Sequence, residues 1–141
     1  MIEQAKKILR ENPYTCVFVK DDWCFTSIDR GVAPLLQCLE QNNVPSGFCA
    51  ADKVVGKAAA FLYVLLKVDT LYTDVISEPA LIVLKKYNIK VEAGEVVKAI
   101  RNRTDTGYCP METAVWEIDN PEEALEAIIK QRELLRKAPA E

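Results

Sequence analysis

At residues 51–60 the chain reads Ala51-Asp52-Lys53-Val54-Val55-Gly56-Lys57-Ala58-Ala59-Ala60, and residues 61–66 are all hydrophobic. Asp52 belongs to a residue type that caps helices, so the stretch predicts a helix with its body at residues 55–67. A helix that is apolar on nearly every side is buried on nearly every side. We therefore expect this helix at the centre of the fold.

The flanking segments predict both strands and helices. Residues 15–20 and 23–28 are rich in β-formers around Asp21-Asp22, which predicts a hairpin. Residues 48–51 fit a short strand or an extended approach to the central helix. Residues 69–76 alternate as a strand does, and residues 89–93 are expected to form another strand, which Gly94 interrupts. Residues 95–100 fit either a strand or a helix.

Apolar residues show helical spacing at residues 2–11, at residues 32–41 and beyond Asn120. A further helix is expected to start at Ser77, which suits a cap, and to run to about Tyr87. A strand–helix–strand unit after a hairpin implies an α/β fold with three layers, αβα, in which helices cover both faces of a mixed sheet of about four or five strands. At 141 residues the chain fits one domain, residues 1–141, with a helical C-terminal extension from about residue 120.

The composition of the chain limits the classes of partner that we expect it to bind. Half of the residues are hydrophobic and 28% are charged, which is typical of a soluble globular domain. The net charge of −3 gives no general attraction to nucleic acid. The longest apolar run, residues 58–66, is shorter than the roughly 20 residues that a bilayer span requires. The N-terminus lacks the apolar core of a signal peptide. We expect a cytoplasmic protein with no membrane partner and no nucleic-acid partner.

The starts of two predicted helices hold Val55-Gly56-Lys57-Ala58 and the segment from Ser77 to Val83. On element order and these two locations, residues 15–117 resemble the cytidine-deaminase-like fold, and more closely a bacterial family of unknown function in that superfamily. The resemblance implies His/Cys-x-Glu at the first place and Pro-Cys-x-x-Cys at the second. Here Pro79 matches, Ala80 and Val83 replace the two thiols, and the chain has no histidine. Such residues cannot ligate zinc, so we expect no metal, no cofactor and no zinc-dependent deamination.

A thiol is the leading candidate for chemistry. Cys109 directly precedes Pro110, which suits the first helical position, so Cys109 is expected to cap a helix whose dipole favours a thiolate. Arg101 and Arg103 lie upstream, and their positive charges would stabilise the thiolate further. Glu112 is either a base beside the thiol or its reciprocal partner in a capping box. Cys109, Lys53 and Glu112 form the predicted catalytic set, against the alternative that Cys109 is a capping residue without chemistry.

The predicted ligand site lies at the start of the central helix. A phosphate or carboxylate on the N–H groups near Gly56, held by Lys53 or Lys57, explains a glycine at that place. Close packing against another helix explains it equally well, and Asp52 either contacts the ligand or caps the helix. The turn of residues 104–107 is an anion-binding nest or an ordinary solvated turn. The predicted ligand-binding set is Asp52, Lys53, Gly56, Lys57, Ser77, Arg103 and Gly107.

Two functions fit these residues. The first is the binding of a small anionic or nucleotide-like ligand, with Cys109 as the nucleophile if a reaction occurs. The second is a non-catalytic scaffold or regulatory subunit that forms a homo-oligomer through the apolar face of residues 125–135. An enzyme and a binding protein are both compatible with the sequence.

Overall fold

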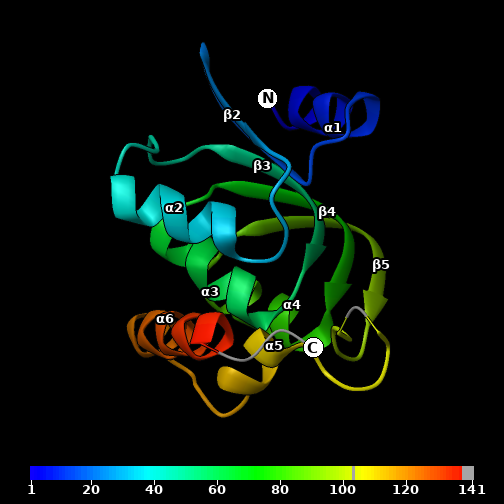
Figure 1. The fold of residues 1–141 in the computed structure, drawn as a ribbon. Coiled ribbons are helices and arrows are strands. Elements are labelled where there is room, and N and C mark those ends of the chain that lie inside the picture. The colour runs from blue at the N-terminus through cyan, green and yellow to red at the C-terminus, as the bar shows by residue number, and fades with distance from the viewer. Residues whose placement is uncertain (103, 138–141) are drawn as a thin grey trace.

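The computed structural model describes residues 1–102 and 104–137 and builds them around one open sheet (Figure 1). The elements in chain order are α1 (Ile2–Glu11), β1 (Cys16–Lys20), β2 (Trp23–Ser27), α2 (Ala33–Gln41), β3 (Cys49–Val55), α3 (Lys57–Leu66), β4 (Thr70–Ser77), α4 (Glu78–Lys86), β5 (Lys90–Val97), α5 (Pro110–Ala114) and α6 (Pro121–Lys137).

The sheet is mixed and contains five described strands in the order β2-β1-β3-β4-β5. Strand β1 runs antiparallel to β2 and to β3, whereas β3, β4 and β5 are parallel. The predicted hairpin is confirmed: Lys20 pairs with Trp23 around the turn, where Asp21 has a φ of 51°. The expectation of an α/β fold with a mixed sheet is confirmed.

Helices cover both faces of the sheet (Figure 1). Successive side chains of a strand point to opposite faces. Val17 and Val19 therefore pack in a cluster with Ala5 and Leu9 of α1. Phe18 points the other way, and its ring lies 4.7 Å from that of Phe48, between centroids, in the main core. Helix α1 covers one face, and the remaining helices lie on the other.

Helix α3 is the centre of the larger helical layer, as expected. Each residue from 57 to 63 is buried, and the helix packs against α2, α4, α5 and α6. Its start differs from the prediction. Asp52 does not cap it, because β3 continues to Val55 and Gly56 is the residue before the helix. Pairing on both sides of β3, with Cys16 and Thr73 opposite Asp52, outweighs the local preference of an aspartate for a cap.

Gly94 does not interrupt its strand, so that prediction is also wrong. β5 continues to Val97, and a Cβ on Gly94 would lie 2.8 Å from the carbonyl oxygen of Asp74 in β4. The glycine permits a close approach of two strands where the sheet bends. Leu71 and Ile76 of β4 both lie in the main core. They are five residues apart, so strict alternation along a flat strand would place their side chains on opposite faces. Figure 1 shows β3, β4 and β5 curving towards the helical layer at their carboxyl ends.

Helix α6 packs onto α3 and α5. Asn120 caps it, as predicted, since its Oδ1 accepts the N–H groups of Glu122 and Glu123 at 2.9 and 3.1 Å. Ala124 and Ile128 are fully buried. No helix in residues 1–102 and 104–137 combines the length and apolar character that a membrane span requires.

Candidate functional site

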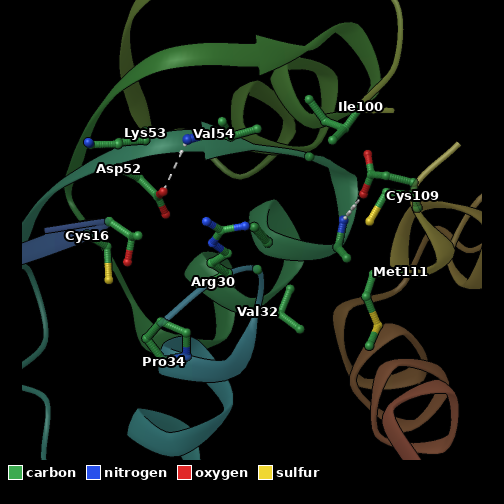
Figure 2. Close-up of a pocket in the computed structure, with 16 residues that line it drawn as sticks. Cys16, Arg30, Val32, Pro34, Asp52, Lys53, Val54, Ile100, Cys109 and Met111 are labelled. Carbon is green, nitrogen blue, oxygen red and sulfur yellow. Dashed lines mark hydrogen bonds between the residues drawn. The ribbon is translucent and has the colours of Figure 1, made fainter. Parts of the chain in front are cut away.

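A pocket of about 360 Å³ lies at the carboxyl end of β3 (Figure 2). Its walls come from the start of β1, the segment that enters α2, the end of β3, the start of α3, Ile100 and α5. Most of the lining is apolar, including Val32, Pro34, Val54 and Met111. In open α/β sheets, ligands bind outside the carboxyl ends of the strands, and this pocket occupies that position.

Asp52 supplies a half-buried carboxyl group to the pocket. Its Oδ2 accepts the Tyr63 hydroxyl at 2.6 Å, and its Oδ1 accepts the N–H of Val54 at 3.3 Å. Removal from bulk water raises the pKa of the Asp52 carboxyl to about 7, although these hydrogen bonds act to lower it. Near neutral pH the group is therefore present in both protonation states, and it can accept a hydrogen bond from a ligand or donate one.

Arg30 supplies positive charge to the pocket, and the sequence patterns did not predict it as a site residue. The residue lies in the segment before α2, and Figure 2 shows its guanidinium reaching into the pocket between Asp52 and α5. Within the described part of the chain no carboxylate lies within 4.0 Å of it. Guanidinium groups stay protonated, so Arg30 offers an unneutralised cation. In the connector Asp29-Arg30-Gly31 only its charge could have marked it.

Lys53 was expected to hold the ligand or to take part in catalysis. Its residue borders the pocket, but Figure 2 shows the ammonium extending away from the Asp52 carboxyl. Alternation along β3 explains the direction, because Asp52 faces Tyr63 of α3 and the next side chain turns to the opposite side.

The predicted anion site at the start of α3 is filled by the chain itself. The carboxylate of Glu112 accepts the N–H groups of Lys57 and Ala58 at 2.8 and 3.0 Å. Glu112 is 3% exposed. A carboxylate at this place satisfies unpaired amide groups and interacts favourably with the helix dipole. Glu112 therefore caps α3 and not its own helix, so of the two alternatives for Glu112 the capping box with Cys109 is wrong.

Gly56 is explained by the same contact. A Cβ on this residue would lie 2.4 Å from the carboxyl carbon of Glu112. Of the two explanations that the sequence left open, close packing against another helix fits, because the approaching group is the side chain of Glu112 in α5. Sequence patterns could not identify it, because residues 56 and 112 are far apart in the chain.

Cys109 occupies the N-cap position of α5, as predicted, but its side chain makes no capping hydrogen bond and the helix spans only Pro110–Ala114. The residue is half-buried and borders the pocket. Arg101 is engaged elsewhere: its Nε donates to Asp105 at 2.9 Å and its guanidinium lies 5.5 Å from the Tyr108 ring centroid. The other expected cation, Arg103, lies outside the described residues.

Three further predicted site residues lie away from this pocket. The Nζ of Lys57 donates to the carbonyl oxygen of Trp116 at 2.9 Å and borders a different cavity. Ser77 is buried and caps α4 by accepting the Ala80 N–H at 3.2 Å, which confirms the predicted cap. Gly107 accepts the Asn102 N–H at 2.9 Å within its own loop. The pocket thus unites Asp52, Lys53, Gly56, Cys109 and Glu112 of the predicted set.

The described residues contain no group of three His, Cys, Asp or Glu side chains placed to hold a metal ion. Ala80 and Val83, at the places where the resemblance to deaminases implied two thiolates, are buried apolar residues of α4. No donor set for zinc exists in this part of the chain.

Comparisons with known proteins place the chain in a family. No curated protein matches it. The crystal structure of TM1506 from Thermotoga maritima, a DUF1893 family protein, is similar, with a TM-score of 0.81 and 29% identity; the match covers 96% of this chain and 88% of that chain. A domain of unknown function, DUF1893, matches residues 4–131. The chain therefore belongs to the DUF1893 family.

Proposed function

We propose that this protein binds a small anionic or nucleotide-like molecule in the pocket at the end of β3, in a cytidine-deaminase-like fold that has lost zinc chemistry. The observation that carries the proposal is the placement of Asp52 and Arg30 in one largely apolar pocket. A few convergent polar groups in an apolar cavity of roughly 300–1,000 Å³ are typical of small-molecule sites, and this pocket measures about 360 Å³.

The polar groups define the ligand. Arg30 suits a carboxylate or phosphate, which its planar fork of donors can bind in bidentate fashion. Asp52 suits an N–H or O–H group of the ligand. The N–H groups at the start of α3 are bonded to Glu112, so a bound anion relies on Arg30. The apolar walls suit a flat ring.

Titration of the purified chain with nucleoside monophosphates and the matching nucleosides, by calorimetry and by amide NMR shifts, tests the proposal. We expect the monophosphates to bind more tightly. Arg30→Met should weaken binding roughly ten-fold or more, as for loss of a charge-assisted hydrogen bond. Lys53→Met is the matched control, since that ammonium points away, and should change little. Equal losses in both variants, or no binding by any probe, would contradict the proposal.

Cys109 is the proposed nucleophile if a reaction occurs, because its thiol borders the same pocket. Exposed Cys24 is an internal control. Iodoacetamide labelling over a pH series, read by peptide mass spectrometry, should show Cys109 reacting faster than Cys24 although Cys109 is less exposed. Slower labelling of Cys109 at every pH would leave it as a wall residue only.

The second candidate function, a scaffold that self-associates, rests on the end of α6. Ile129, Leu134 and Leu135 are 40%, 58% and 46% exposed there. Deleting residues 120–141 would also remove the buried Ala124 and Ile128, so point variants are the better test. If α6 forms a homo-oligomer, Leu134→Glu with Leu135→Glu lowers the mass measured by light scattering, and Glu126→Gln does not. An unchanged mass would count against self-association through this face.

A further inference from the structure

We propose that a second cavity, of about 180 Å³ between α3 and α4, binds a small organic monocarboxylate with an apolar body. Lys57 and Lys86 supply its positive charge, and Phe61, Val83 and Ile82 supply much of its apolar wall. This cavity shares no lining residue with the pocket at the end of β3. The inference is independent of the function proposed above.

Lys57 provides the first argument. It is only 9% exposed, and among the described residues its ammonium has one hydrogen-bond acceptor, the Trp116 carbonyl oxygen at 2.9 Å. The Nζ lies 5.7 Å from the Phe61 ring centroid. An ammonium carries three donors. Among residues 1–102 and 104–137 no carboxylate lies within 4.0 Å of Lys57. A buried charge without a counter-ion is unfavourable, so this position favours an anion.

Lys86 adds a second basic residue to the lining of the same cavity. Its Nζ lies 5.6 Å from the ring centroid of Tyr87, and the described chain again places no carboxylate within 4.0 Å of it. Ile82, on the same wall, is 68% exposed. A bare inorganic anion would use the two ammonium groups but leave this apolar wall uncovered. A carboxylate on a short hydrocarbon body uses both.

Asp119 is the cavity's own carboxylate and defines the competing interaction. It lines the cavity but lies more than 4.0 Å from both ammonium groups. Asp119 is exposed, so its charge repels a carboxylate ligand with an energy that solvent reduces. Neutralising it should therefore strengthen binding, whereas removing a lysine should weaken it. Opposite effects of two substitutions in one cavity distinguish a specific site from general surface attraction.

The probe is isovalerate, with isovaleramide as its uncharged analogue, titrated into the full chain and followed by backbone amide shifts in NMR. We expect saturable shifts at Phe61, Val83 and Tyr87 with isovalerate and much weaker ones with the amide. Lys86→Ala should weaken binding roughly ten-fold, as for loss of an interaction with a charged group. Lys85→Ala is the matched control, since Lys85 is exposed in the same turn of α4 but does not line the cavity.

Asp119→Asn should tighten isovalerate binding several-fold, and a thermal melt of each variant verifies that it is folded. The proposal is overturned if the amide binds as well as the acid, or if Lys85→Ala loses as much affinity as Lys86→Ala. It is equally overturned if isovalerate gives no saturable shifts with the parent chain and with Asp119→Asn, or if inorganic phosphate binds as tightly as isovalerate.

Discussion

Gly56 and Glu112 join two segments that are distant in sequence at a single point. The glycine lets the carboxylate reach the amide groups of Lys57 and Ala58, and a Cβ would lie 2.4 Å from the carboxyl carbon. Gly56→Ala should therefore destabilise the fold by roughly 1–3 kcal/mol, as overpacking does. Urea unfolding measures the effect. Gly107→Ala, where the nearest atom is 4.0 Å away, is the control and should stay within about 0.5 kcal/mol.

Asp52 should make stability depend on pH. Its pKa is about 7 in the folded chain against an ordinary value of 3.8, so the folded state holds a proton that the unfolded state releases first. The free energy of unfolding then falls as pH rises from about 4 to about 7 and levels off above that range. Asp52→Asn removes this contribution, which is on the order of a few kcal/mol. Urea midpoints from pH 4 to 8 should fall less for the variant, and parallel curves would contradict the assignment.

Among the helices, α6 carries two neighbouring isoleucines that differ in burial and therefore in their contribution to stability. Ile128 is fully buried in the main core, whereas Ile129 is 40% exposed. Ile128→Ala should cost roughly 2–5 kcal/mol, the range for large-to-small core substitutions, and Ile129→Ala should cost much less. Denaturant midpoints of the two variants provide the comparison. Similar losses would mean that α6 is not anchored through Ile128.

Helix α5 is too short to be stable alone, and its position depends on Glu112. Glu112→Gln retains one acceptor oxygen but loses the charge, so amide hydrogen exchange at Lys57 and Ala58 should become faster. Iodoacetamide should also label Cys109 faster as the pocket wall loosens. Glu117→Gln, at an exposed position shortly after α5, serves as the control. Unchanged exchange in Glu112→Gln would show that the two hydrogen bonds do not hold α5 in place.

At the scale of the whole molecule, two apolar clusters lie on opposite faces of one sheet. Because β1 and β3 contribute to both, we expect residues 1–141 to unfold as a single cooperative unit. Leu9→Ala in the α1 cluster should lower the midpoint, with a loss of roughly 2–5 kcal/mol, while circular dichroism and tryptophan fluorescence still give coincident transitions. Separate transitions would show that α1 unfolds on its own. Leu134→Ala, at a position 58% exposed, should leave the midpoint nearly unchanged.

Much of the fold was predictable, because it rests on local signals. Spacing gave the helices at 2–11 and 32–41, the Asp21-Asp22 turn gave the hairpin, and Ser77 and Asn120 marked two helix starts. The errors occurred where pairing across the sheet overrode a local preference, at Asp52 and Gly94. The assignment to the cytidine-deaminase-like superfamily stays a prediction.

The class of fold, the central apolar helix and the lack of histidine follow from the sequence alone, since they depend on residue type and periodicity. Tertiary contacts place Glu112 at the anion position beside Gly56, bring Arg30 into the pocket and direct Lys57 to a different cavity. The physical reason is that each of these contacts joins segments distant along the chain. The direction of a side chain there depends on the sheet and helices that surround it.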